Sequence, residues 1–392
     1  MPRVRRTIGA AARRRVRFAA ALLGCACSGL AAAQLPLEPG GVEQLPPHPG
    51  AHWVWVNDFA FFALPDGKAF LVDGDSGKML GLLSTGYSFN SLVVPRSGGV
   101  IYSPEIYFAR GTRGTRTDVV TIYDTVHLAP LGEVKIPPKR ASIMAMIAGQ
   151  VLTDDERFLL IYNYTPAQSA TVVDTRARKF VGEIDTAGCA LVYPTGPRSF
   201  FSICGDGSLL VVTLNDEGRA ASRTRTKALF DGIKDPLTEK GVRWGDTWLF
   251  ASFEGTMYPL KITRGGGIEP TATWPLFSAA ELAQHWRTGG LQHLALHAAS
   301  GRLFAIVHRG GPETHKDPGA DVWVWDLATR RKVQQIAARN KVASIQVTRD
   351  AQPLLFGCSF ESNRLDIYDA VAGKYLRSVD GLGITPGLLV IP

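Results

Sequence analysis

Residues 322–336 read VWVWDLATRRKVQQI: an apolar run of β-branched and aromatic residues, an Asp at its end, a polar turn and a second apolar run. Such a segment predicts a β-hairpin whose Asp hydrogen-bonds its own backbone in the turn. The pattern recurs as AFLVDGDSGKMLGLL at 69–83, ATVVDTRARKFVGEI at 170–184 and LDIYDAVAGKYLRSV at 365–379, and its first half recurs as VVTIYD at 119–124. The chain is therefore expected to repeat one hairpin unit.

The number of units follows from the spacing of the aspartates that end these runs. They are separated by 51, 50, 152 and 43 residues, at Asp73, Asp124, Asp174, Asp326 and Asp369. Because 152 is close to three periods, two diverged copies should lie in that gap, and LLVVTL at 209–214 and MYPLKI at 257–262 supply them. Seven units of about 40–50 residues are typical of a β-propeller. We therefore predict an all-β, seven-bladed β-propeller rather than two tandem sandwiches, which need no constant period.

The basic residues are concentrated at one end of the chain. Of 392 residues, 45% are apolar and 20% charged, which excludes a disordered chain. The net charge of +8 would ordinarily indicate nucleic acid or an anionic membrane as a partner. Seven arginines, however, lie within the first 33 residues, which contain no Asp or Glu, and 36 basic and 35 acidic residues remain. We therefore expect no nucleic-acid partner.

The N-terminal segment has the three parts of a secretory signal peptide. A basic region is followed by an apolar run from Phe18 to Leu30 and by a small-residue cleavage site at Ala31–Ala33. The apolar run is too short to span a bilayer. Arg5-Arg6 and Cys25 leave twin-arginine export and lipoprotein processing open as alternatives. The expected organisation is a signal peptide, a Pro/Gly-rich arm and a propeller, at residues 1–33, 34–51 and 52–392.

Three cysteines remain after removal of the signal peptide: Cys189, Cys204 and Cys358. In an oxidising compartment, two cysteines 15 residues apart across a strand-turn-strand segment predict a disulfide between Cys189 and Cys204. The loop that they close would stabilise the fold by about 3 kcal/mol. Cys358 ends a strand-like run, LLFGC, and is expected to be a buried, inert thiol.

No self-contained catalytic or metal-binding set is found in the sequence. His293 and His297 lie in an alternating segment without the Glu and helix of a zinc-protease motif. The loop HRGGPETHKDPG at 308–319 could hold a metal or an anion, but a loop held by its own hydrogen bonds is the simpler interpretation. Ser76 in GDSG at 74–77 lies in a hairpin turn without an oxyanion site or a histidine. Catalytic, metal-binding and cofactor-binding residues are therefore expected to be absent from this chain.

Aromatic side chains gather near the start of the expected propeller. They are Trp53, Trp55, Phe59, Phe61 and Phe62. They can pack between blades, as aromatics often do. Alternatively, they form an apolar wall that faces a ligand or another protein.

Several phrases resemble the heavy subunit of the quinoprotein amine dehydrogenases, in collinear order from about residue 50 to the C-terminus. They are VND at 56–58, RGTRTDVVTIYD at 113–124, IPPKR at 136–140, RSFFSICGDG at 198–207, HW-x-x-GG at 285–290 and ETHKDPGADVWVWD at 313–326. The middle segments, including EGRAASRTRTKALF at 217–230, look closer to the aromatic amine dehydrogenase branch than to methylamine dehydrogenase.

The resemblance implies a periplasmic propeller that pairs with a small light chain in a two-heavy, two-light assembly. The light chain of that family carries tryptophan tryptophylquinone and the catalytic Asp. A primary amine is oxidised to the aldehyde and ammonia, and electrons leave to a blue copper protein of the azurin or amicyanin type. The heavy chain then supplies a scaffold and part of the substrate channel.

The resemblance also assigns roles to particular residues. Cys189 and Cys204 match the heavy-chain disulfide of the family. Phe62 aligns best with a channel-lining phenylalanine by its spacing from Asp58, whereas Phe61 matches the aromatic branch better, and Phe59 completes an aromatic group that departs from both branches. The alternative hypothesis is a stand-alone secreted propeller that binds or scaffolds other molecules without redox activity.

Overall fold

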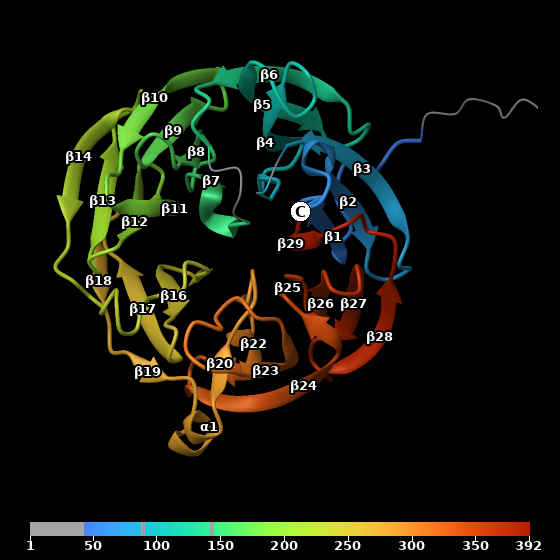
Figure 1. The fold of residues 1–392 in the computed structure, drawn as a ribbon, viewed down its shortest axis with the longest axis vertical. Coiled ribbons are helices and arrows are strands. Elements are labelled where there is room, and N and C mark those ends of the chain that lie inside the picture. Colours follow the sequence, from blue (N-terminus) through green and yellow to red (C-terminus); the bar gives the residue numbers. More distant parts are fainter. Residues whose placement is uncertain (1–42, 88, 90, 141–144) are drawn as a thin grey trace, which may run out of the picture. The chain divides into compact units, whose positions relative to one another are not determined.

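A computed structural model describes residues 43–87, 89, 91–140 and 145–392 of the chain. These residues form seven antiparallel sheets arranged around one centre, each with one edge towards the centre and one towards the outside (Figure 1). The predicted seven-bladed, all-β propeller is confirmed. The predicted signal peptide and residues 34–42 of the predicted arm lie outside the described residues.

In the first four blades, the strands are given from the innermost to the outermost. Apart from β29 in blade 1, they occur in the order of the sequence. Blade 1 contains β29 (Pro386–Val390), β1 (Trp53–Asp58), β2 (Gly67–Asp73) and β3 (Met79–Gly86). Blade 2 contains β4 (Val100–Phe108), β5 (Arg116–Asp124) and β6 (Pro130–Ile136), with Val93 bridging to Tyr102 on the inner side. Blade 3 contains β7 (Gln150–Leu152), β8 (Phe158–Asn163), β9 (Ser169–Asp174) and β10 (Lys179–Asp185). Blade 4 contains β11 (Cys189–Gly196), β12 (Ser199–Cys204), β13 (Leu209–Leu214) and β14 (Ala220–Arg225).

The last three blades carry the irregular elements. Blade 5 contains β15 (Val242–Trp244), β16 (Thr247–Ala251), β17 (Thr256–Ile262) and β18 (Ile268–Pro270), and β19 (Trp274–Pro275) also pairs with β17. In blade 6, β20 (Trp286–Thr288) and β21 (Leu294–His297) both pair with β22 (Arg302–Arg309), which is followed by β23 (Gly319–Asp326) and β24 (Arg331–Val342). Blade 7 contains β25 (Ser344–Val347), β26 (Leu354–Ser359), β27 (Arg364–Asp369) and β28 (Lys374–Val379). Three short helices, η1 (Leu64–Asp66), η2 (Ile147–Gly149) and α1 (Ala279–Ala283), connect strands.

The repeated sequence pattern marks the same position in every blade. Six of the apolar runs lie in the third strand from the centre: β2, β9, β13, β17, β23 and β27. The seventh lies in β5, which takes the third position in blade 2 when the bridge at Val93 is counted as the innermost strand. These strands have neighbouring blades on both faces and are therefore largely buried, whereas the outermost strand β24 alternates between exposed and covered residues. The aspartates close the turns as predicted: Asp369 Oδ1, for example, accepts the N–H groups of Val371 (2.9 Å) and Ala372 (2.8 Å).

The last strand of the chain completes the first blade. β29 pairs with β1, so the innermost strand of blade 1 comes from the opposite end of the described chain. On the neighbouring loops, His52 Nδ1 lies 2.8 Å from Asp75 Oδ1 of blade 1, and its Nε2 lies 3.2 Å from Asp350 Oδ2 of blade 7. Strand pairing and this histidine together close the ring between blades 1 and 7.

The segment SAAELAQHW at 278–286 is typical of a helix in sequence, with Ser278 and Glu281 at the spacing of a capping box. The structure forms this capping box, but helix α1 covers only Ala279–Ala283. Trp286 instead begins β20, where it pairs with Arg309. Strand pairing thus overrides helix propensity at the end of this segment. In the part of the chain that the structure describes, no helix is long and apolar enough to cross a bilayer.

Candidate functional site

Strand direction divides the loops of the propeller between two faces. Within each blade the strands, counted from the centre, alternate in direction. The loops between second and third strands therefore lie on one side of the propeller, and the loops that join one blade to the next lie on that same side. We call this side the front face. The back face carries the loops between first and second strands and between third and fourth strands.

The loop that contains the three predicted channel residues lies on the front face, between β1 and β2. Asp58, at the end of β1, is 1% exposed and organises this loop. Its Oδ1 accepts the N–H groups of Ala60 (2.9 Å) and Thr385 (2.6 Å), and its Oδ2 accepts that of Ile384 (3.0 Å). One carboxylate therefore ties residues 59–62 to the segment that precedes β29.

Neighbouring residues add further links to the same segment. The N–H of Phe59 donates to the carbonyl oxygen of Thr385 (3.2 Å), and that of Phe61 donates to Thr385 Oγ1 (3.1 Å). Asn57 Nδ2 donates to the carbonyl oxygen of Leu388 (3.0 Å). Gly383 is required here, because an added Cβ would come within 2.0 Å of Asp58 Oδ2. The aromatic loop is thus held by its backbone.

The three phenylalanines differ strongly in exposure. Phe59 is 3% exposed and stacks on Phe89, with ring centroids 5.9 Å apart. Phe61 is 52% exposed and meets the edges of both Phe89 (6.0 Å) and Phe62 (5.4 Å), while Phe62 is 87% exposed. Phe59 and Phe89 form the base of this group, and Phe61 and Phe62 present their rings outside the propeller.

The five aromatics that are adjacent in the sequence do not form a single wall. Trp53 and Trp55 lie at the start of β1, near the back face, where Trp55 pairs with Leu71 and Val390 in the sheet. The phenylalanines follow the other end of the same strand. Trp55 is buried and belongs to the core between blades 1 and 2, as the packing interpretation predicts.

Other exposed apolar side chains also lie on the front face, on loops or strand ends of different blades. They are Tyr107 (41% exposed), Tyr164 (54%), Ile233 (92%) and Ile384 (38%). Exposed apolar groups on one face are typical of a surface that another protein covers. Together with Phe61 and Phe62, they make the front face a candidate for partner binding, and Met79, Leu131 and Val371 are exposed near the back face.

Two buried polar groups lie at the front-face ends of their blades. Glu105 is fully buried and accepts hydrogen bonds from Tyr107 (2.6 Å), Thr121 (2.5 Å) and Tyr123 (3.1 Å); burial raises its pKa. Lys240 is 3% exposed and donates to the carbonyl oxygen of His315 (3.3 Å), and burial lowers its pKa. Neither group lies beside an activated nucleophile in the described residues.

The histidines singled out in the sequence hydrogen-bond to or stack on other groups rather than one another. His297 Nδ1 contacts Ser300 Oγ (2.7 Å), and its Nε2 contacts the carbonyl oxygen of Asp350 (2.9 Å). His293 is buried against Thr238, which strongly lowers its pKa. His308 Nε2 lies 3.0 Å from Thr314 Oγ1 within its own loop, and His315 stacks on Phe253. No group of three potential metal ligands occurs among the residues that the structure describes.

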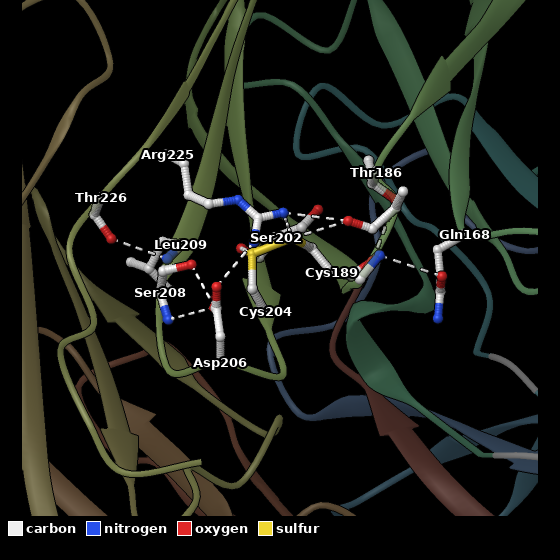
Figure 2. Close-up of a disulfide and its surroundings, with 12 residues drawn as sticks. Gln168, Thr186, Cys189, Ser202, Cys204, Asp206, Ser208, Leu209, Arg225 and Thr226 are labelled. Carbon is white, nitrogen blue, oxygen red and sulfur yellow. Dashed lines mark hydrogen bonds and ion pairs between the residues drawn. A yellow bond between two sulfur atoms is a disulfide. The ribbon is translucent and has the colours of Figure 1, made fainter.

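The predicted disulfide joins Cys189 on β11 to Cys204 on β12, which face each other in the strand register (Figure 2). Arg225 reaches this bond from β14: its guanidinium donates to Asp206 Oδ2 (3.0 Å), to the carbonyl oxygen of Ala187 (3.2 Å) and to Cys189 Sγ (3.3 Å). The disulfide therefore fastens the two inner strands of blade 4. Cys358 is a buried free thiol, and burial raises its pKa.

Two residues that hold the aromatic loop were not identified by sequence reasoning alone. Phe89 lies far from the loop in sequence, and Thr385 lies more than 300 residues away. Asp58 belongs to VND at 56–58, one of the phrases that resemble the amine dehydrogenase heavy subunits. This resemblance was the one sequence signal that pointed to Asp58.

Comparison with known proteins identifies similarity over almost the whole propeller. The family described as "Methylamine dehydrogenase heavy chain (MADH)" matches residues 50–391. A methylamine dehydrogenase heavy chain from Paracoccus versutus is 30% identical over 346 residues, covering 88% of this chain and 80% of the relative. A methylamine dehydrogenase heavy chain from Methylophilus methylotrophus is 29% identical over 328 residues, covering 82% and 79% of the two chains.

Solved structures agree on the fold. The Cps50 (Swd1) β-propeller domain of Myceliophteria thermophila superposes with a TM-score of 0.52 at 12% identity, covering 78% of this chain and 91% of that domain. At this identity the likeness concerns architecture alone.

Proposed function

Because the chain belongs to the methylamine dehydrogenase heavy chain family, we propose that it is the non-catalytic heavy subunit of a tryptophan tryptophylquinone-dependent amine dehydrogenase. The enzyme would oxidise a primary amine to the aldehyde and ammonia in the periplasm and pass electrons to a blue copper protein. The family match over residues 50–391 carries this proposal, because it covers every blade.

The distribution of chemical groups supports a division of labour between two chains. In the described residues, the buried acids, lysines and histidines make hydrogen bonds within a blade or to a neighbouring blade and do not form a nucleophile-base pair. The quinone, held by the light chain, would supply the electrophile and the two-electron acceptor. This chain would bind the light chain, shape the route to the quinone and exclude water from it.

The front face is the proposed docking surface for the light chain. It carries exposed apolar side chains from several blades, including Phe62, Tyr164 and Ile233. Burying one such side chain contributes about 1.5–3 kcal/mol. A partner covering this face would therefore gain free energy from residues that are exposed in this chain alone.

Phe61 and Phe62 are proposed to line the substrate channel at the edge of this interface. Their backbone is fixed by Asp58 and Thr385, while their rings project outwards. A fixed backbone gives the rings a defined position, so they can set the width of an apolar entrance. Phe59, being buried against Phe89, would support this wall from beneath.

Co-expression tests the proposal. The chain is produced with its signal peptide, alone and together with a small Cys- and Trp-rich chain encoded beside it and the maturation proteins encoded there. Amine-dependent reduction of a redox dye should require both chains. The stand-alone propeller hypothesis is favoured instead if no such small chain is encoded nearby, or if the matured small chain neither binds this protein nor yields activity with it.

A further inference from the structure

A cavity of about 480 Å³ opens on the back face, on the opposite side of the propeller from the aromatic loop. Its floor is formed by Trp53, Trp55 and Leu71 of blade 1 and by Ile101 of blade 2. Cavities of about 300–1,000 Å³ with mainly apolar walls are the usual size of small-molecule sites. The volume is therefore sufficient for a ligand with one or two rings.

The segment Pro46–Pro49 forms one wall of this cavity. Its position is set by hydrogen bonds on either side: Leu45 N–H donates to the carbonyl oxygen of Val126 (2.9 Å), and Trp53 N–H donates to that of Gly50 (3.2 Å). Three prolines within four residues restrict the backbone of this wall. The cavity is thus built from elements whose backbones are held in place.

Two arginines, Arg96 and Arg349, are the charged side chains that line the cavity, and no Asp or Glu side chain lines it. Burial lowers the pKa of Arg349, and the nearby charge of Arg96 lowers it further. Arg349 donates to the main-chain oxygens of Ile391 (3.1 Å) and Pro392 (2.8 Å).

The guanidinium of Arg96 has no carboxylate partner among the described residues. Glu156 Oε1 instead accepts the main-chain N–H of Arg96 (2.5 Å). Glu156 and Asp154 do not line this cavity, but they line a neighbouring cavity to which Arg96 also contributes. Arg96 is exposed and forms no ion pair in the described residues, so its guanidinium is available to an anion in this cavity.

We propose that this cavity, which we call the Trp55 pocket, binds a small aromatic or aliphatic molecule carrying one carboxylate or sulfonate group. The apolar part would pack on Trp53, Trp55 and Leu71. The anionic group would pair with Arg96, since charge-assisted hydrogen bonds to a guanidinium are among the stronger polar contacts. A cationic amine does not suit this lining, so the pocket is distinct from the route proposed for the amine substrate.

Ligand-observed ¹⁹F NMR tests the proposal with two matched probes, 6-fluoro-2-naphthoate and its neutral analogue 6-fluoro-2-naphthamide. The protein is the purified chain, with its light chain where the two copurify. We expect saturable binding of the acid with a Kd below about 1 mM, and binding of the amide about tenfold weaker. Added salt should weaken binding of the acid but not of the amide.

Variants locate the binding site. Arg96→Gln should weaken binding of the acid about tenfold and leave the amide unchanged, because the lost interaction is ionic. Arg110→Gln is the matched control: it removes an exposed arginine from a front-face loop and should change neither Kd. Trp55→Phe should weaken both probes, with thermal unfolding measured to confirm that the variant is folded.

Three results would overturn the proposal. They are the absence of saturable binding of the acid, equal affinities of acid and amide, and an unchanged acid Kd in Arg96→Gln. None of these results bears on the pairing with a light chain, because the Trp55 pocket lies on the opposite face from the proposed interface.

Discussion

Asp58→Asn is the substitution that links the fold of this chain most closely to its proposed channel. The carboxylate of Asp58 is almost completely buried and accepts three main-chain hydrogen bonds, from Ala60, Thr385 and Ile384. In the Asn variant, the side-chain oxygen can still accept the N–H groups of Ala60 and Thr385. The NH₂ group then faces the N–H of Ile384, which is left without an acceptor.

The expected cost follows from these contacts. A hydrogen bond to a charged group contributes about 1.5–3 kcal/mol, and a buried donor without a partner costs a similar amount. Asp58→Asn loses one such bond and weakens two, so the free energy of unfolding should fall by about 3 kcal/mol. Asp58→Ala removes all three acceptor interactions and should cost about 5 kcal/mol.

Two measurements check this reasoning. Urea unfolding gives the change in stability, with Asp185→Asn, an exposed carboxylate on β10, as the matched control. Hydrogen exchange should accelerate in Asp58→Asn within two peptides, residues 59–62 and 382–386, and not in blade 4. A loss of stability no larger than that of Asp185→Asn, with unchanged exchange in both peptides, would show that Asp58 does not hold the loop.

Three further predictions concern the disulfide, the ring closure and the channel. Replacing Cys189 and Cys204 together by Ser should lower the free energy of unfolding by about 3 kcal/mol, measured in urea, because the bond closes a short loop. His52→Asn should destabilise the chain more at about pH 5.5 than at about pH 8.5. Burial lowers the pKa of His52, but the carboxylates of Asp75 and Asp350 outweigh this effect, so the pKa is raised on folding. The stabilisation by His52 is therefore present below its unfolded pKa of about 6.5 and is lost as the pH rises through its folded pKa. Phe62→Ala, or Phe61→Ala if Phe61 is the channel residue, should change the ratio of kcat/KM for methylamine and 2-phenylethylamine by about tenfold in the assembled enzyme, because apolar volume opens at the entrance.

Each of these predictions has a result that would remove it. Equal stability of the Cys-to-Ser double variant and the parent under non-reducing conditions would exclude a stabilising disulfide. A pH-independent effect of His52→Asn would show that its protonation does not support ring closure. For the channel, Phe180→Ala on the outer strand β10 is the control, and relative kcat/KM values that match this control in both phenylalanine variants would remove the channel assignment.

The sequence was most informative where the pattern repeats. The third strand of each blade is covered on both faces, so its apolar run persists even in the diverged copies at 209–214 and 257–262. Two of the innermost strands, β7 and β15, carry no comparable signal, because they are only three residues long. Their place in the sheets is set by neighbouring strands rather than by their own composition.

Contacts that join distant parts of the chain could not be predicted from one sequence. The pairing of β29 with β1 and the hydrogen bonds from Thr385 to the aromatic loop depend on ring closure. The aromatic cluster illustrates the same point. Trp55 lies within β1 and Phe59 directly follows this strand, yet Trp55 packs between blades 1 and 2 whereas Phe59 stacks on Phe89 beneath Phe61 and Phe62.

Purification of this protein from its native host tests the assignment as an amine dehydrogenase heavy subunit. Intact-mass analysis and absorbance spectroscopy of the purified complex identify any bound chain and its cofactor. We predict a stoichiometric small chain with several disulfides, a cross-linked pair of tryptophans and a quinone absorbance that is bleached by a primary amine. A homogeneous propeller without a small chain or quinone absorbance, from cells grown on amines, would show that the chain does not serve as this subunit.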